Sequence, residues 1–156
     1  MKNQNTKIEK LISPVIENMG YIIWHMNIKN ITPMLIQIYI DFAQSNCDKN
    51  ISINDCSKVS KYIKSLLCTE NYPILKNFIL EISSPGIERF LYKPEHYVKY
   101  VGRKIFLVIN KSISACQDYE FTCTLLGYSN NRLNIAINDQ IIDVDIANVC
   151  RSQLKI

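Results

Sequence analysis

The periodicity of apolar residues in this chain changes once, near Lys93-Pro94, where we expect a hinge. Before it, apolar residues recur at helical spacing in two stretches and at strand spacing in three. After it, only short alternating runs follow, separated by Ser, Asn, Asp and Gly. A chain of 156 residues is long enough for two small domains, each with its own core. We therefore predict an α/β domain at residues 1–91 and a β-rich domain at residues 92–156.

The first stretch predicts an amphipathic helix over residues 6–19. Thr6 and Glu9 have the spacing of a capping box, and Gly20 stands where a helix often ends. Pro14 removes one backbone donor, so we expect a kink there. One face of this helix collects the apolar residues Ile8, Leu11, Ile12, Val15, Ile16 and Met19.

Two strands are predicted next, at residues 21–29 and 34–41. Tyr21, Ile23 and His25 fall on one face of the first strand by alternation. A histidine among apolar strand residues is more often packed against the sheet than catalytic, so we expect His25 to pack there.

A second helix is predicted over residues 53–68, with Ser52 or Asn54 as its N-cap. A third strand at residues 77–83 completes the order α-β-β-α-β, which predicts a two-layer α+β domain with both helices on one face. The buried stripe of the second helix is Cys56, Val59, Ile63, Leu66 and Leu67, and its exposed face carries Lys58, Lys61 and Lys64.

The second half of the chain predicts five short strands in about 60 residues, a density typical of a small barrel. Asn130-Asn131 and Asn138-Asp139 have the composition of tight hairpin turns, because Asn and Asp tolerate positive φ. The strands are expected at residues 104–110, 119–128, 132–137, 140–146 and 149–155.

Composition excludes several classes of protein. The net charge of +4 is mild and divides evenly, since residues 1–92 carry 10 basic and 8 acidic side chains and residues 93–156 carry 8 and 6. This balance permits contact with nucleic acid but does not require it. No apolar run reaches the roughly 20 residues of a membrane span. The six cysteines include no C-x-x-C pair, which predicts no metal site and reduced, mostly buried thiols.

One segment is similar to a known family signature. Residues 80–89 read Leu-Glu-Ile-Ser-Ser-Pro-Gly-Ile-Glu-Arg, which resembles the LEVSSPG-x-x-R signature of the ribosome maturation factor RimP family. The helix end at Met19-Gly20, the helix start at Ser52 and the pair His96-Tyr97 match in order and spacing. Phe90 departs from the family, which commonly has proline there.

The resemblance implies the following architecture and role. An N-terminal α/β domain is followed by an SH3/Sm-like barrel, and the protein binds the free small (30S) ribosomal subunit and assists its late maturation. It is bacterial, cytoplasmic, not an enzyme and without a cofactor. Its partner is a ribosomal protein, 16S rRNA or both, with no membrane and no small-molecule substrate, and we expect a monomer.

The signature predicts a binding loop formed by Ser83, Ser84, Pro85, Gly86 and Arg89. Pro85 fixes one φ angle and Gly86 permits positive φ, so the chain reverses at a defined place. Arg89 offers a planar fork suited to phosphate or carboxylate. The alternative is that the loop only joins the domains, with Arg89 paired to a nearby acid.

The exposed lysines of the second helix, Lys58, Lys61 and Lys64, are candidates for rRNA phosphate contacts, although solvated helix faces often carry lysines. The α-β-β-α-β order is similar to the prokaryotic KH layout. A KH domain clamps nucleic acid with a G-x-x-G loop, and the four glycines of this chain do not form one: they are Gly20, Gly86, Gly102 and Gly127.

A hydrolase is the alternative from a different functional class. A nucleophile, base and orienting group can be assembled on paper from Ser84, His25 or His96, and Asp41 or Asp55. No G-x-S-x-G, H-E-x-x-H or P-loop motif supports them. We expect His96 to cap or pack near the domain junction instead.

Overall fold

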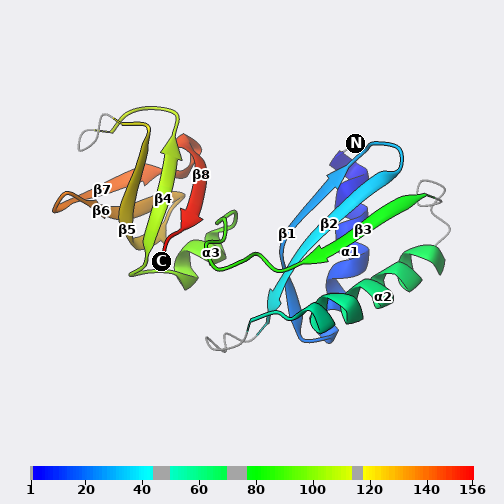
Figure 1. Cartoon of the computed structure of the whole chain (residues 1–156). Helices are drawn as coiled ribbons and strands as arrows, with labels where there is room; N and C mark the ends of the chain where they lie inside the picture. The colour runs from blue at the N-terminus through cyan, green and yellow to red at the C-terminus, as the bar shows by residue number, and fades with distance from the viewer. Residues whose placement is uncertain (1, 44–49, 70–76, 114–117) are drawn as a thin grey trace. The chain divides into compact units, whose positions relative to one another are not determined.

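The computed structural model describes residues 2–43, 50–69, 77–113 and 118–156. They form two compact units, Met1–Pro85 and Gly86–Ile156 (Figure 1). The first holds α1 (Lys2–Asn18), β1 (Tyr21–Lys29), β2 (Met34–Phe42), α2 (Ile53–Thr69) and β3 (Phe78–Ser83). The second holds α3 (Pro94–Lys99), β4 (Lys104–Ile109), β5 (Glu120–Ser129), β6 (Arg132–Ile137), β7 (Gln140–Asp145), a short 3₁₀ helix (Ile146–Asn148) and β8 (Val149–Leu154). The predicted mixed α+β class is confirmed.

The first unit is a three-stranded sheet with β2 between β1 and β3 (Figure 1). β1 runs antiparallel to β2, and β3 runs parallel to it. Alternate residues of β2 pack in the core against side chains from one face of α1 and one face of α2. Each such buried aliphatic side chain contributes about 1.5–3 kcal/mol. The fully buried core residues include Ile12, Ile16, Ile36, Ile38, Ile40, Val59, Ile63 and Leu67.

α1 begins earlier than predicted, at Lys2, so Thr6 lies inside the helix and the predicted capping box at Thr6 and Glu9 is wrong. Pro14 lies inside α1 without ending it. Gly20 has a φ of +88° and its amide donates to Glu17 O at 2.9 Å, so the predicted helix end is confirmed.

β1 contains a bulge that the alternation did not predict. The pairing of β1 with β2 shifts register between Ile23 and His25, and Trp24 between them is buried. The bulge moves His25 out of the series begun by Tyr21 and Ile23. His25 is half-buried, and its ring centroid lies 6.2 Å from that of Tyr39. The expected packing of His25 on the sheet is confirmed.

The segment just before the boundary predicted after Leu91 is hydrogen-bonded to the second unit. The Leu91 amide donates to Ser152 O and the Leu154 amide donates to Arg89 O, both at 2.9 Å. Phe90 forms an isolated antiparallel bridge with Gln153. These bonds tie the chain from Arg89 to Leu91 onto β8, and the compact units divide between residues 85 and 86.

Lys93-Pro94 starts α3, a helix that the sequence did not reveal. Proline is well suited to the first helical position because its missing N–H would have no partner there. His96 caps the helix as expected: its Nδ1 accepts from the amides of Tyr92 at 3.1 Å and Lys93 at 3.4 Å.

The five strands of the second unit form an antiparallel sheet in the order β7-β6-β5-β4-β8. Both predicted hairpin turns are confirmed, since Asn130, Asn131, Asn138 and Asp139 all have φ between 48° and 60°. Among the described residues no ladder joins β7 to β8, so the sheet is not a closed barrel.

The thiols differ from the prediction that they would be mostly buried. Among the described cysteines, Cys123 is buried, Cys56 is half-buried, and Cys68 and Cys150 are exposed. Burial raises the pKa of Cys123 to about 12. The other two cysteines, Cys47 and Cys116, lie outside the described residues. None of the described helices is long and apolar enough to cross a bilayer.

Candidate binding surface

The first part of the signature loop follows directly from β3. Ser83 is the last residue of that strand and is exposed, while Ser84 and Pro85 are half-buried. The Ser83 hydroxyl donates to the Ser84 carbonyl at 3.4 Å, a long and local hydrogen bond. The predicted closure of the loop by serine side chains is therefore weak.

The second part of the loop is fixed by Gly86 and Arg89. Gly86 has a φ of +79°, as predicted, so a side chain at this position would be strained. The Arg89 Nε donates to the Gly86 carbonyl at 2.8 Å, and the Arg89 side chain is half-buried rather than exposed. This bond braces the turn from inside the second unit. Glu88, which precedes Arg89 in the chain, forms an ion pair with Lys155 at 2.8 Å.

The start of α2 is held by a capping box. Ser52 is the N-cap: its hydroxyl accepts from the Asp55 amide at 3.2 Å, and the Asp55 carboxylate accepts from the Ser52 amide at 2.8 Å. The Tyr21 hydroxyl donates to the other Asp55 oxygen at 2.6 Å, which ties α2 to β1. The Ser52 hydroxyl also donates to the Asp55 carboxylate at 2.6 Å. This bond and the one from Tyr21 lower the pKa of Asp55, and the bond to Asp55 raises the pKa of Tyr21 to about 12.

Asp55→Asn is expected to lower the free energy of unfolding by about 1–2 kcal/mol near pH 7, because it weakens the cap and the bond to Tyr21. The lowered pKa means that the Asp55 carboxylate stabilises the fold above its unfolded value of about 3.9 and loses this effect as pH falls through the folded value. Urea titrations should therefore show a difference between the two proteins at pH 7 that shrinks below about pH 4. A difference independent of pH would contradict the charged cap.

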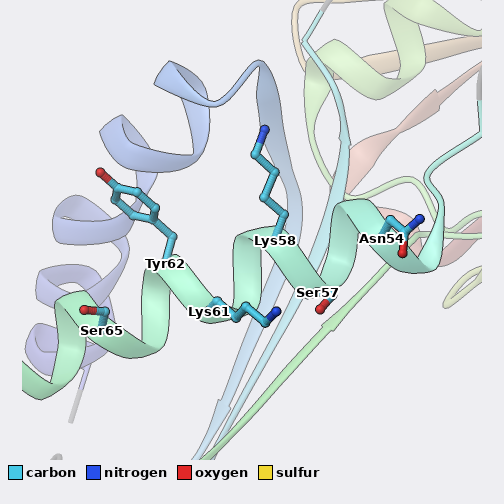
Figure 2. Close-up of a pocket in the computed structure, with 6 residues that line it drawn as sticks. All are labelled: Asn54, Ser57, Lys58, Lys61, Tyr62 and Ser65. Atoms are coloured by element: carbon cyan, nitrogen blue, oxygen red, sulfur yellow. The ribbon is translucent and has the colours of Figure 1, made fainter.

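One exposed face of α2 forms an open hollow of about 510 Å³ (Figure 2). Figure 2 shows Lys58 and Tyr62 projecting from the same side of the helix, and Lys61 lying back toward Ser57. The lining residues are Asn54, Ser57, Lys58, Lys61, Tyr62 and Ser65, all from α2. Two of the three predicted lysines, Lys58 and Lys61, are thus brought together, while Lys64 is exposed but does not line the hollow.

Tyr62 is the residue of this surface that sequence analysis missed. Its side chain is 61% exposed, although it lies next to the buried Ile63. The available signal was an aromatic residue outside the apolar stripe and between basic neighbours. An exposed ring beside two ammonium groups can stack on an unpaired base while the lysines contact phosphates. The exposed groups of this face thus include one aromatic ring and two ammonium groups.

Three of the groups proposed for a hydrolytic site, Asp41, Asp55 and His96, have structural roles here. Both oxygens of Asp55 are hydrogen-bonded in the capping region, Asp41 is buried and accepts from the Phe42 amide at 3.1 Å, and His96 Nδ1 caps α3. Within the described residues, no group of three or more His, Cys, Asp or Glu side chains could hold a metal ion.

Comparison with protein families identifies the first unit. Residues 11–88 match the model of the RimP N-terminal domain, which is half of the chain. The match begins inside α1, ends one residue before Arg89 and includes the capping box and hollow of α2. The chain therefore belongs to the RimP family of ribosome maturation factors.

Proposed function

We propose that this chain is a non-enzymatic bacterial assembly factor that binds the free small (30S) ribosomal subunit and assists its late maturation. The observation that carries the proposal is the family match over residues 11–88. It acts in the cytoplasm as a monomer, with a ribosomal protein, 16S rRNA or both as its partner.

The exposed chemistry of the first unit supports a ribonucleoprotein partner. Lys58, Lys61 and Tyr62 offer phosphate and base contacts on α2, and Lys64 adds a further charge on the same helix. The residues Ser83, Ser84 and Pro85 present polar groups at the end of β3. We infer that these two regions contact the immature subunit.

We also infer that the second unit is a small barrel of the SH3/Sm-like kind. Its two end strands, β7 and β8, are consecutive in sequence and are joined by a single 3₁₀ turn at Ile146–Asn148. Pairing of these neighbours along their free edges, with the strand tilt and stagger that closure requires, would complete the barrel.

The test of the function is co-sedimentation of the full chain with free 30S subunits, free 50S subunits and mature 70S particles. We expect binding to the free 30S subunit alone, because a maturation factor must leave before the subunits join. Equal binding to 70S particles, or no binding to 30S subunits, would contradict the proposal.

Arg89→Ala should weaken association with the 30S subunit by about three- to tenfold, because the turn loses the bond from Nε to the Gly86 carbonyl. That single hydrogen bond is worth about 0.5–1.5 kcal/mol, so thermal unfolding should change by only a few degrees. The matched control is Arg132→Ala, at the exposed start of β6. An equal loss of affinity in both variants would show that Arg89 is not part of the binding surface.

A further inference from the structure

The second unit contains a hollow of about 380 Å³ at the start of β8. Its volume lies at the lower end of the range for ligand pockets, which suits one base-sized group. Three aromatic rings, one guanidinium and one buried hydroxyl line it, from Phe90, Tyr92, Tyr97, Arg151 and Ser152.

The hollow arises where the segment that follows Arg89 separates from β8. Phe90 bridges Gln153, but beyond Leu91 the backbone turns into α3. The Tyr97 hydroxyl donates to the Leu91 carbonyl at 3.3 Å, and His96 Nδ1 accepts from the amides of the next two residues. The side chains of α3 therefore hold this segment away from the first residues of β8.

Ser152 brings an unsatisfied polar group to this hollow. Its side chain is 3% exposed, and its Oγ has no hydrogen-bond partner among the described residues. Burial raises the pKa of Tyr97, and Ser152 partly opposes this rise, but the Tyr97 hydroxyl donates to the Leu91 carbonyl and not to Ser152. A buried hydroxyl without a partner is costly, so a ligand that offers an acceptor or a donor here would be favoured.

Arg151 supplies a positioned positive charge. Its Cζ lies 5.4 Å from the centroid of the Phe90 ring and 5.6 Å from that of Phe106, so two rings hold the guanidinium by cation–π contact. Within the part of the chain that the structure describes, Arg151 has no ion pair, and Glu88 is paired with Lys155. The N–H groups of a guanidinium held in this way suit a phosphate.

We propose that this hollow binds one nucleotide of single-stranded RNA, with its base against Phe90 and Tyr92, its phosphate on Arg151 and a base-edge polar atom on Ser152. Tyr92 is 51% exposed, so its ring is accessible to a base. An acidic peptide would satisfy Arg151 but would leave the flat aromatic faces unused. This site lies outside the region matched by the family model, and its assignment does not depend on 30S binding.

The test is an NMR titration of the ¹⁵N-labelled full chain with a single-stranded hexaribonucleotide at low salt. Parallel titrations use an acidic hexapeptide and inorganic phosphate. The oligonucleotide should shift the amides of residues 90–92 and 149–152. Tyr92→Ala should weaken its affinity about tenfold, and Arg151→Gln about five- to tenfold. The matched controls are Tyr119→Ala, whose ring is 54% exposed in the same unit, and Arg132→Gln.

Ser152→Ala separates a role in binding from a role in folding. Removing an unpaired hydroxyl should leave the melting temperature unchanged or raised, while affinity for the oligonucleotide falls about three- to tenfold. The proposal is overturned if Ser152→Ala lowers the melting temperature and leaves affinity unchanged. It is also overturned if the peptide shifts these amides and the oligonucleotide does not, if phosphate alone binds as tightly, or if Tyr119→Ala loses as much affinity as Tyr92→Ala.

Discussion

Ile36→Ala is expected to lower the free energy of unfolding of the first unit by about 2–5 kcal/mol. Ile36 is fully buried in the middle of the central strand, opposite Ile28 on β1 and Leu80 on β3. Natural domains are stable by only about 5–15 kcal/mol, so this variant should be close to unfolding. Urea titration followed by the fluorescence of Trp24, the single tryptophan of the chain, reports on this unit.

The matched control is Ile79→Ala, the same substitution in the same sheet at a position that is 47% exposed. This substitution should lower the free energy of unfolding by well under half as much as Ile36→Ala. Amide signals of residues 104–154 should persist in Ile36→Ala at urea concentrations where β2 has melted, if the chain comprises two independent domains as we propose. Simultaneous loss of both sets of signals would contradict that organisation.

Lys58→Glu combined with Lys61→Glu is expected to weaken binding to the free 30S subunit by at least tenfold. Both side chains line the α2 hollow, so two phosphate attractions become repulsions. If the contacts come from Lys58, Lys61, Lys64 and Arg89, the slope of log affinity against log salt in the unmodified protein should be about −2 to −4. The slope of the double variant should be shallower by the contribution of about two phosphate contacts. The measurement is an affinity series over salt concentration.

The control for this charge change is Lys7→Glu combined with Lys10→Glu, two exposed lysines of α1. It alters net charge equally and should have a much smaller effect. Equal weakening by both pairs would show that only overall charge matters. Tight, steeply salt-dependent binding to naked rRNA would contradict the shallow slope expected from these few phosphate contacts.

Most of the fold can be predicted from the sequence because most of its elements have a strong local signal. β4 and β6 alternate cleanly between buried and more exposed residues, and the tight turns require the positive φ that Asn130-Asn131 and Asn138-Asp139 adopt. What was missed depends on contacts between distant residues. α3 has only six residues and is fixed by His96 and Tyr97, and the bulge at Trp24 depends on its pairing with β2.

The candidate sites were only partly predictable for the same reason. Helical spacing placed Lys58 and Lys61 on one face, but it could not separate them from Lys64 or show that Tyr62 is exposed. The half-burial of Arg89 follows from its bond to the Gly86 carbonyl, which sequence does not reveal. The hollow of the second unit joins residues 90–97 to residues 146–152 and exists only once β8 has paired.

The two sheets differ in how soon the neighbouring strands of each strand are synthesised during translation. All strands of the first unit are made before residue 86, whereas β4 must wait for β8, about 45 residues later. At the usual 5–20 residues per second this delay lasts several seconds. During that time β4 can pair with β5 while its other edge remains open, and unpaired edges favour aggregation. A stop codon or strong pause before β8 should therefore reduce the folding yield of the second unit much more than that of the first.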